Sequence, residues 1–424
     1  MSIVRTAYET ATTLAQPVLG VLVRRRVRRG KEVAGREGER FGRASLPRPT
    51  GRLIWLHGAS IGETRLLLEL AREVRTRLPE TCFLLTSQTV TAAKLIDQAI
   101  EGDESLAGRT FHQFAPLDAP AIAKRFLSHW VPDAAIFAEG EIWPNLLKQL
   151  KKSGIPTALV NARMTDKSID GWGRWKKLSK SIFGTFDIIL AADARTASGL
   201  ERMLGKPVPN PGNLKAALPP PGHDAAEEEH LKRGFIGARQ CLVAVSTHEG
   251  EEDFLLNARA QMDRKPATII IPRHPERAAT IVDRLNQRGV SHVRRSMGES
   301  PELDTDVLLA DTLGEVGLFV RLADTVYLGG GHAPGIGGHN PIEILRLGKP
   351  LATGPDVFNF DDAKAQLSGQ RGYNIVETPE QLVAGFPYEP PEDSLIHDLE
   401  SKARTPMDET LNALMPVLKG RKAE

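Results

Sequence analysis

From residue 52 onward, short apolar runs of five or six residues alternate with longer stretches in which apolar residues recur at helical spacing. Such runs, bounded by turn residues and separated by helices, predict βαβ units with parallel strands. A first series comprises LIWLH (53–57), CFLLTS (82–87), AAIFAE (134–139), TALVNA (157–162) and DIILAA (187–192). A second comprises CLVAVS (241–246), ATIIIP (267–272), DVLLAD (306–311), TVYLGG (325–330) and PLATG (350–354). The pattern therefore predicts an α/β protein with two parallel sheets.

A segment dense in Pro and Gly, residues 208–222, separates the two series and predicts a domain boundary. We predict two doubly wound, Rossmann-like domains over residues 36–210 and 211–392. An N-terminal arm (1–35) precedes them, and a helical tail (393–424) is expected to pack back across them. We expect the two domains to face a central cleft in which the carboxyl ends of both sheets hold a ligand.

The composition is that of a soluble globular protein, with 41% hydrophobic and 25% charged residues over 424 positions. It excludes a largely disordered chain or a coiled coil. The two cysteines, Cys82 and Cys241, lie far apart, which excludes a disulfide scaffold and suits a reducing compartment. The eleven histidines show no paired zinc spacing, so we predict neither a metal site nor a cofactor.

The positive charge is concentrated near the N-terminus. Residues 24–52 hold 11 Lys and Arg against 3 Asp and Glu, so they carry +8 and the rest of the chain −6. A nucleic-acid-binding protein usually spreads basic surface over its folded domains, so we expect no nucleic-acid partner.

The basic cluster follows an apolar stretch, residues 11–23, which is shorter than the roughly 20 residues that a membrane-spanning helix needs. A signal peptide would carry its charge before the apolar run. An apolar helix followed by arginines predicts an interfacial anchor on the anionic cytoplasmic leaflet of a membrane. The alternative is an ordinary solvated N-terminal helix.

The segment WLHGASIGE (55–63) predicts a strand, a glycine turn and a helix start. Gly58-x-Ser60-x-Gly62 matches the nucleophile elbow of α/β-hydrolases, although an elbow normally lies deeper in its domain. In a second interpretation the glycines let the backbone approach a ligand, and Glu63 is a general base. In a third, Glu63 only complements the helix dipole.

Three further segments of the first half carry polar residues after predicted strands. Glu139 and Glu141 lie two residues apart, so in an extended chain their carboxylates would share one face and one pKa would be raised. The alternative is a solvated acidic turn. Asn161 and Arg163 lie at the end of the next strand and suit hydroxyl or phosphate contacts. Lys215 lies in the segment of the predicted domain boundary, and its positive charge is suited to stabilising a negative charge that develops in a reaction.

The second half has the pattern of a nucleotide site. Arg273 and His274 follow a buried strand, and arginine suits phosphate because its fork donates two hydrogen bonds. DTLGEVG (311–317) predicts a turn into a helix, with Glu315 near the start. YLGGGHAPGIGGHNPIE (327–343) predicts a strand and a glycine-rich loop, followed by a helix with Asn340 as N-cap, Pro341 at N1 and Glu343 at N3. A glycine-rich loop entering a helix favours an anion or nucleotide site, and Glu343 is an alternative acceptor for ribose hydroxyls.

The tripeptide Asp304-Thr305-Asp306 is similar to the metal-binding DxD of some glycosyltransferases. It precedes a predicted strand, whereas a ligand site is expected at a carboxyl end, so we do not predict a metal there.

Ten ordered segments between residues 36 and 363 resemble the family of 3-deoxy-D-manno-octulosonic acid (Kdo) transferases, GT-B enzymes of lipopolysaccharide synthesis (family 30). They include WLHGASIGE, EGEIWPN, PGNLK, STHEGEE, PRHPER, DTLGE and GGHNPIE. The resemblance implies an inverting, metal-independent transfer of Kdo from CMP-Kdo to a lipid A precursor (lipid IVA), at the cytoplasmic face of the bacterial inner membrane. It implies an N-terminal membrane-associated helix.

The resemblance also implies roles for individual residues. Glu63 is implied to be the general base, and Glu139 or Glu141, with Lys215, to assist the transition state. The residues implied to hold the CMP of the donor are Pro272, Arg273, His274, Leu313, Gly314, Glu315, Asn340, Pro341, Ile342 and Glu343. A GT-B transferase that uses another nucleotide sugar, a Ser60 hydrolase and a non-catalytic nucleotide- or lipid-binding protein are the alternatives.

Overall fold

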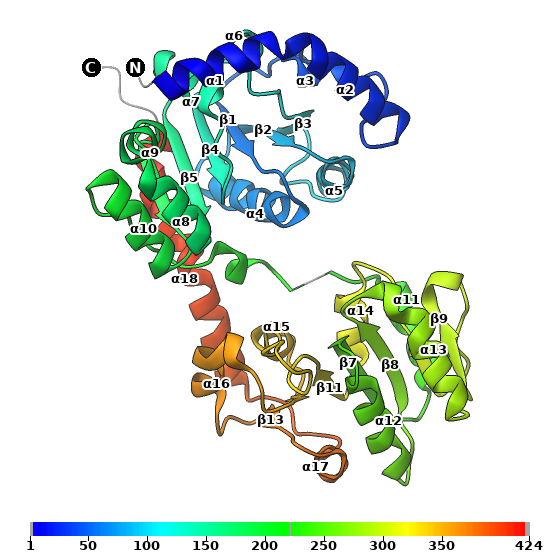
Figure 1. The fold of residues 1–424 in the computed structure, drawn as a ribbon. Coiled ribbons are helices and arrows are strands. Elements are labelled where there is room, and N and C mark those ends of the chain that lie inside the picture. The colour runs from blue at the N-terminus through cyan, green and yellow to red at the C-terminus, as the bar shows by residue number, and fades with distance from the viewer. Residues whose placement is uncertain (1–2, 221, 420–424) are drawn as a thin grey trace. The chain divides into compact units, whose positions relative to one another are not determined.

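The computed structural model describes residues 3–220 and 222–419 and divides into two compact units (Figure 1). Unit 1 comprises Met1–Leu218 and Ala403–Glu424, and unit 2 comprises Pro219–Lys402. The first division falls within the Pro- and Gly-rich segment, after Leu218, where the sequence suggested residue 210.

Unit 1 is built on a six-stranded parallel sheet in the order β3-β2-β1-β4-β5-β6. Successive residues of β1 point to opposite faces, so Leu53 and Trp55 enter one core while Ile54 and Leu56 enter the other. Every residue of β1 is buried, as expected for a parallel strand covered on both faces. The strands are β1 (Leu53–His57), β2 (Cys82–Ser87), β3 (Thr110–Phe114), β4 (Ala134–Ala138), β5 (Thr157–Ala162) and β6 (Ile188–Ala191).

Helices cover both faces of this sheet. One face packs against α6, α7, α8, α9 and α10, and the other against α4, α5 and the end of α18. The helices of unit 1 are α1 (Ile3–Leu14), α2 (Gln16–Arg28), α3 (Glu37–Arg40), α4 (Ile61–Arg77), α5 (Val90–Glu101), α6 (Pro120–Trp130), α7 (Pro144–Lys152), α8 (Asp166–Arg174), α9 (Lys176–Phe183), α10 (Ala194–Leu204) and the 3-10 turn η1 (Leu214–Ala217).

Unit 2 is built on a seven-stranded parallel sheet in the order β13-β12-β11-β7-β8-β10-β9. One face packs against α11, α14, α15, α16 and the start of α18, and the other against α12, α13 and α17. The strands are β7 (Cys241–Thr247), β8 (Ala267–Pro272), β9 (His292–Arg294), β10 (Val307–Leu309), β11 (Thr325–Leu328), β12 (Leu351–Thr353) and β13 (Tyr373–Ile375). The helices are α11 (Ala225–Leu231), η2 (Lys232–Ile236), α12 (Glu251–Gln261), η3 (Pro275–Arg277), α13 (Ala278–Gln287), η4 (Arg295–Met297), α14 (Val316–Leu322), α15 (Ile342–Arg346), η5 (Phe358–Phe360), α16 (Asp361–Leu367), α17 (Pro379–Gly385) and α18 (Asp393–Leu418).

Helix α18 belongs to both units, because the division at Lys402 and Ala403 falls inside it. Its first part buries Leu395 and Leu399 in the core of unit 2. Its second part buries Met407, Leu411 and Leu414 in the core of unit 1, together with residues of α4.

The N-terminal arm forms two helices that follow each other closely, α1 and α2, with Pro17 in the first turn of the second. Polar contacts hold α1 on unit 1: the Tyr8 hydroxyl donates to Asp118 (3.0 Å), and the Asn145 side chain donates to Thr12 (3.1 Å). Among the described residues, no helix combines the length and apolar character needed to cross a bilayer.

Candidate active site and nucleotide-binding site

The predicted catalytic residues of unit 1 gather at the carboxyl edge of its sheet. The strand order reverses between β1 and β4, and in doubly wound sheets this switch point is where ligands bind. Glu63 lies in the first turn of the helix after β1, and Glu139 and Glu141 directly follow β4. Lys215, on η1, reaches the same edge, since a Cβ atom at Gly62 would lie 3.2 Å from its Nζ.

Glu63 closes a capping box at the start of α4. The Ser60 hydroxyl accepts from the Glu63 backbone N–H (3.2 Å), and Oε2 of Glu63 accepts from the N–H groups of Ser60 (3.2 Å) and Ala59. This is the helix-start role that the sequence left open. Oε1 of Glu63 makes no hydrogen bond to any described residue. One oxygen therefore fixes the buried carboxylate, and the other is free to accept a proton.

Ser60 does not have the geometry of a hydrolase nucleophile. Its backbone is extended (φ −102°, ψ 165°), not strained, and its hydroxyl serves as the N-cap. The imidazole of His57 lies against Thr86 (2.8 Å) and Glu141 (3.1 Å), so it is engaged away from Ser60. The Ser60 hydrolase alternative thus has no support in this geometry.

Glu139 and Glu141 point to different partners. β4 ends at Ala138, and Glu139 adopts a left-handed conformation (φ 55°), so the expectation of two carboxylates on one face of an extended chain is wrong. Oε1 of Glu139 lies 2.5 Å from Nζ of Lys215 and accepts from the Asn161 amide (3.2 Å). Asn161 is also left-handed (φ 51°) and accepts from the Leu214 N–H (2.9 Å). Such conformations cost roughly 1–3 kcal/mol each and cluster at functional sites.

Glu141 accepts three hydrogen bonds at Oε2, from His57 (3.1 Å), the Trp143 indole (2.8 Å) and the Gln88 amide (3.3 Å). Burial alone would raise the pKa of Glu141, but the hydrogen bond and charge of His57, together with the Trp143 and Gln88 hydrogen bonds, hold it below its ordinary value. The raised pKa that the sequence suggested for this pair of carboxylates is therefore not found at Glu141.

Two residues of this site, His57 and Gln88, escaped the sequence analysis. His57 is the last residue of β1, so its place at a strand end was the available signal. Gln88 is held from α3, because Arg40 donates to its carbonyl (2.7 Å). Arg40 is buried and paired with Glu32 (3.0 Å), so part of the positive charge of residues 24–52 supports the fold of unit 1.

In unit 2 the strand order reverses between β7 and β11, where the glycine-rich loop begins. The buried Glu251 carboxylate accepts from the N–H groups of Gly330 (2.8 Å), His332 (3.1 Å) and His248 (2.9 Å). A Cβ at Gly329 would lie 2.4 Å from the Ser246 carbonyl oxygen, so this glycine permits close backbone packing. The start of the loop is thus already occupied by a carboxylate of the chain.

Three histidines join two of the predicted donor-binding segments. His248, after β7, contacts His339 of the loop (Nε2 to Nε2, 2.9 Å) and packs edge-on to His274 after β8 (ring centroids 6.0 Å apart). Burial, then the neighbouring His248 and Arg273 side chains, lower the pKa of His339 to about 4. Burial likewise lowers the pKa of His248 against the opposing effect of the Glu251 charge, with His274, Arg277 and Arg273 contributing to the decrease. Sequence reasoning gave no role to His248 or His339.

Arg273 is exposed, and its side chain makes no hydrogen bond or ion pair to a described residue. Pro272 ends β8 directly before it. An unpaired guanidinium at the carboxyl end of a strand, beside the imidazoles of His248 and His339, is suited to a phosphate or carboxylate group.

The helix after the glycine loop begins later than predicted, at Ile342, and has five residues. Pro341 therefore occupies the N-cap, and the Asn340 side chain accepts from the Ile342 N–H (3.1 Å) instead of from residue 343. Asn340 also donates to Glu343 (3.5 Å), so the two are neighbours although the predicted capping box is not formed.

The segment Leu313-Gly314-Glu315 follows β10, the neighbour of β8. Glu315 is paired with Arg295 (2.6 Å); burial alone would raise its pKa, but the hydrogen bonds of Arg295 and Thr312 hold it below its ordinary value. Gly314 is left-handed (φ 91°), and the Leu313 side chain is 86% exposed. The predicted donor residues thus all lie on segments that follow the carboxyl ends of β8, β10 and β11.

Asp304 and Asp306 lie at the opposite end of the sheet, before β10. Asp306 is bonded by Arg259 and by the hydroxyl and backbone of Ser291, so its carboxylate serves the fold. Over the described part of the chain, no group of three or more His, Cys, Asp or Glu side chains is arranged to hold a metal ion.

Comparison with known proteins agrees with this architecture. The family model for 3-deoxy-D-manno-octulosonic-acid transferase (kdotransferase) matches residues 36–218. The chain is 31% identical over 383 residues to the 3-deoxy-D-manno-octulosonic acid transferase of Rickettsia bellii, covering 88% of each. It is 31% identical over 376 residues to that of Haemophilus influenzae, covering 86% of this chain and 85% of the relative. A glycosyltransferase from Rickettsia africae superposes with a TM-score of 0.53 at 12% identity, covering 88% of this chain and all of that one, which shows a shared fold.

Proposed function

Because the chain belongs to the 3-deoxy-D-manno-octulosonic acid transferase family and is therefore a glycosyltransferase, we propose that it transfers Kdo from CMP-Kdo to a lipid A precursor. The observation that carries the proposal is the family membership over most of the chain's length. The side-chain arrangement at the carboxyl edges of the two sheets supports it.

In the proposed reaction, Oε1 of Glu63 removes the proton from an acceptor sugar hydroxyl. The hydroxyl oxygen forms a bond to the anomeric carbon of Kdo while the bond from that carbon to the phosphate oxygen breaks. The electron pair of the broken bond leaves with CMP. Attack opposite the leaving group inverts the anomeric configuration. The hydrogen bonds of Glu63 support this role. Oε2 accepts the capping hydrogen bonds and fixes the side chain, while Oε1 is left to accept the proton.

Lys215 and the Glu141 cluster are proposed to assist. Lys215 supplies a positive charge near the free carboxylate edge of Glu63, since both border Gly62 and the start of α4. Its pairing with Glu139 sets its position. Glu141 is held ionised by His57 and serves to order the loop between β4 and α7.

In unit 2 the phosphate of CMP is proposed to bind Arg273 and His274, with Asn340 and Glu343 available to the sugar hydroxyls of the nucleoside. The exposed Leu313 is available to the nucleobase or the donor sugar. Because Arg273 can balance the charge of the departing phosphate, the proposal needs no divalent cation.

The acceptor is a lipid, and the N-terminal helices suit contact with a membrane. The exposed apolar side chains Val4, Leu14, Val18 and Val21 recur at helical spacing along α1 and α2. Arg24, Arg25, Arg28, Arg29 and Lys31 follow them, all exposed and without a described partner. An apolar stripe beside unpaired cations favours binding in the plane of an anionic leaflet, so we propose a peripheral location on the cytoplasmic face of the inner membrane.

The test is CMP release from CMP-Kdo, with and without a tetraacyl lipid A precursor, in buffer containing EDTA. Acceptor-dependent release, with an inverted glycosidic bond in the NMR spectrum of the product, is the expected result. No acceptor-dependent release would overturn the proposed substrates. Displacement of bound CMP by UDP at equal concentration would then indicate a GT-B transferase that uses another nucleotide sugar.

A further inference from the structure

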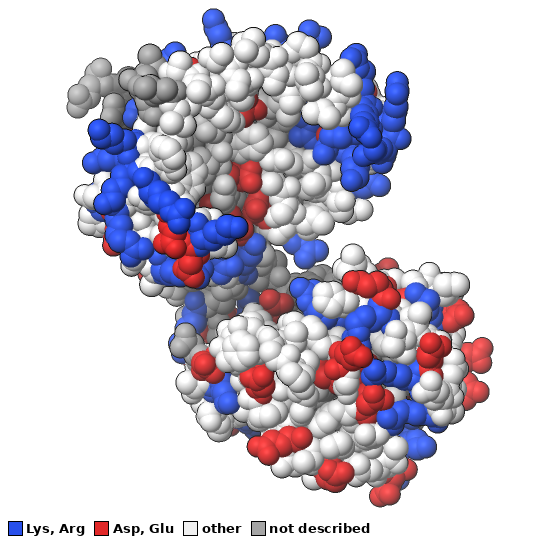
Figure 2. Space-filling model, in the orientation of Figure 1, with Lys and Arg blue, Asp and Glu red and all other residues white. Residues whose placement is uncertain are grey.

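A second basic surface of unit 1 lies on α8 and α9, apart from the N-terminal helices. Blue side chains gather over α2 and again over α8 and α9 (Figure 2). We define the α8–α9 surface by its exposed members: Lys167, Arg174, Trp175, Lys176, Lys177 and Lys180. No role in catalysis or donor binding has been given to any of them.

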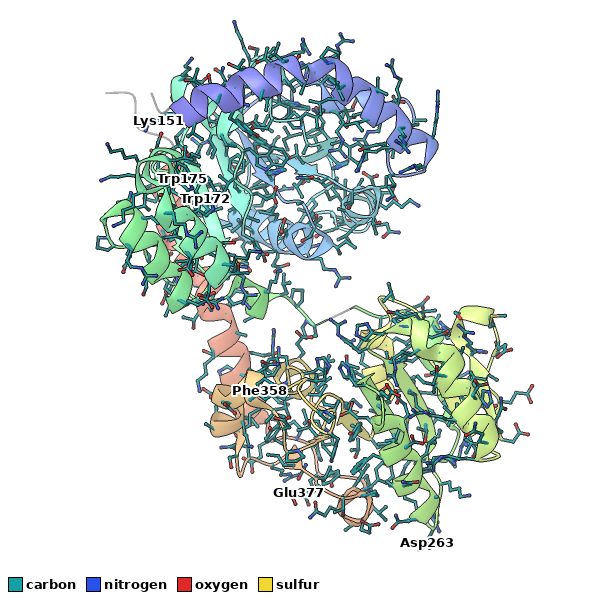
Figure 3. The ribbon with its side chains drawn as sticks, in the orientation of Figure 1. Lys151, Trp172, Trp175, Asp263, Phe358 and Glu377 are labelled. Carbon is teal, nitrogen blue, oxygen red and sulfur yellow. The ribbon has the colours of Figure 1, made fainter. Side chains whose placement is uncertain are left out.

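The two tryptophans of this surface behave differently. Trp172 packs against the core and meets Phe183 edge to face (ring centroids 5.3 Å apart), which ties α8 to α9. Trp175, at the junction of the two helices, leaves 59% of its surface exposed (Figure 3). Leu178, Ile182 and Phe183 turn α9 inward, so its outer face consists of lysines.

The cations of this segment are not neutralised by the protein. Residues 163–184 hold six Lys and Arg but two Asp, a net charge of +4 in a chain that is acidic outside residues 24–52. One of the acids, Asp166, is already paired with Arg195 (3.4 Å). Lys176, Lys177 and Lys180 make no ion pair or side-chain hydrogen bond to a described residue. Their charge is therefore available to an anionic partner.

The surface belongs to the same helical layer that carries α1. Lys148 of α7 pairs with Glu9 of α1, and Lys151 of α7 donates to the carbonyl of Gly184 just after α9 (3.4 Å). Helix α7 thus links the two elements. Helix α1 and the end of α9 are therefore both attached to the same helix of unit 1.

From these observations we propose that the α8–α9 surface is a second contact with an anionic lipid bilayer. Trp175 enters the headgroup region, where tryptophan is favoured, and the lysines and arginines neutralise lipid phosphates. The inference rests on the membrane association proposed above and adds a second point of attachment. Two linked contacts bind more tightly than either alone, and they fix the rotation of unit 1 about the axis of α1.

The experiment measures flotation of the full chain with vesicles of 30% phosphatidylglycerol in phosphatidylcholine, at several salt concentrations. K176E/K177E is expected to weaken binding about tenfold or more, since each lysine near an anionic surface adds to the binding free energy. It is also expected to flatten the salt dependence of binding, because salt screens this attraction. W175A is expected to weaken binding without changing the salt dependence. R264E/K265E in unit 2 makes the same change of charge at exposed positions and is expected to bind as wild type does.

The outcomes separate the two proposals. Absence of wild-type binding to anionic vesicles would overturn the membrane association itself, and this inference with it. Wild-type binding that is unchanged in both K176E/K177E and W175A would overturn the α8–α9 contact alone. An equal loss of vesicle binding in R264E/K265E would show that the effect comes from the net charge of the chain, and it would also overturn the α8–α9 contact. Preference for poly-glutamate over anionic vesicles would indicate an acidic protein partner instead.

Discussion

Nζ of Lys215 lies 2.5 Å from Oε1 of Glu139, and this pair ties the segment that leaves unit 1 to the carboxyl end of β4. Lys215 is three residues from the division between the units, yet it belongs to the site around Glu63. The ion pair therefore holds the last loop of unit 1, which carries Lys215, beside the site around Glu63.

Replacing Glu63 with Gln separates its two roles. Gln keeps an oxygen that accepts from the Ala59 and Ser60 N–H groups, so the melting temperature is expected to stay within about 2 °C of wild type. It cannot accept the acceptor's proton, so kcat is expected to fall about 10²-fold or more. Steady-state kinetics and calorimetry on the same preparation check both statements.

Ser60→Ala is the matched control for that experiment. It removes the N-cap hydroxyl and is expected to cost about 1 kcal/mol of stability while transfer continues. If Ser60→Ala abolished turnover while Glu63→Gln did not, the assignment of the base would be wrong.

Replacing Lys215 with Met removes the positive charge and keeps much of the side-chain volume. We expect kcat to fall about 10²-fold with little change in the affinity for CMP, because Lys215 belongs to unit 1 and CMP to unit 2 in the proposed reaction. Lys206→Met, at an exposed position of unit 1, is the control and should behave as wild type. A loss of CMP affinity in place of turnover would contradict the proposed role.

Glu141→Gln tests the pH dependence of unit 1. The pKa of Glu141 is lowered in the folded state, so its ionised form contributes stability that is present above pH 4.5 and is lost as the pH falls through the folded pKa. At pH 7 the variant is expected to be less stable by about 2 kcal/mol, the scale of hydrogen bonds to a charged group. The difference should shrink towards pH 3.5.

Urea unfolding followed by tryptophan fluorescence measures this effect in unit 1, because all five tryptophans of the chain lie there. Other groups that titrate in acid, such as the buried His112, whose pKa is lowered to about 3 by burial and by Arg36 and Arg40, are common to both proteins and cancel. An equal difference at pH 7 and pH 3.5 would show that His57 does not hold Glu141 ionised.

Arg273→Ala is expected to have two effects. CMP affinity should fall 10- to 100-fold, as expected for the loss of a charge-assisted hydrogen bond to phosphate. The pKa of His339, about 4 in the wild type, should rise, because the charge of Arg273 is one of the causes that lower it. Calorimetry measures the first effect and imidazole NMR titration the second, with Arg264→Ala as a control for a lost surface charge.

Kdo transfer is expected to persist in EDTA and in Asp304→Ala. Asp306, the other carboxylate of that tripeptide, is bonded to Arg259 and Ser291 at the amino end of β10, away from the carboxyl edge. Loss of activity in EDTA that is restored by Mg²⁺ or Mn²⁺ would show that the phosphate of CMP needs a cation besides Arg273.

The sequence predicted the ten most apolar strands closely, because a buried parallel strand is recognised by an unbroken apolar run. It missed β3, β9 and β13, so the sheets have six and seven strands where five and five were expected. β3 reads Thr-Phe-His-Gln-Phe, and two of its buried polar residues make specific contacts: His112 bonds Ser87 (2.9 Å) and Gln113 bonds Trp130 (2.8 Å). β9 and β13 are three-residue edge strands, too short for any periodicity.

The sequence predicted which strand ends carry the site residues. It did not predict which of their side chains contact one another. Periodicity assumes that a chain continues in the conformation it has, but Glu139 and Asn161 turn left-handed directly at the strand ends. The left-handed turn at Glu139 separates its side chain from that of Glu141. His248 and His339 are 91 residues apart, and only the sheet order brings their rings together.

Helix α18 has a consequence for how the chain is made. Residues 1–218 emerge from the ribosome first. Met407, Leu411 and Leu414, which complete the core that covers α4, are synthesised only after the whole of unit 2. Domains usually fold in the order in which they emerge during translation. Here the unit that emerges first keeps apolar surface open until the final helix arrives, so its maturation depends on complete synthesis of its neighbour.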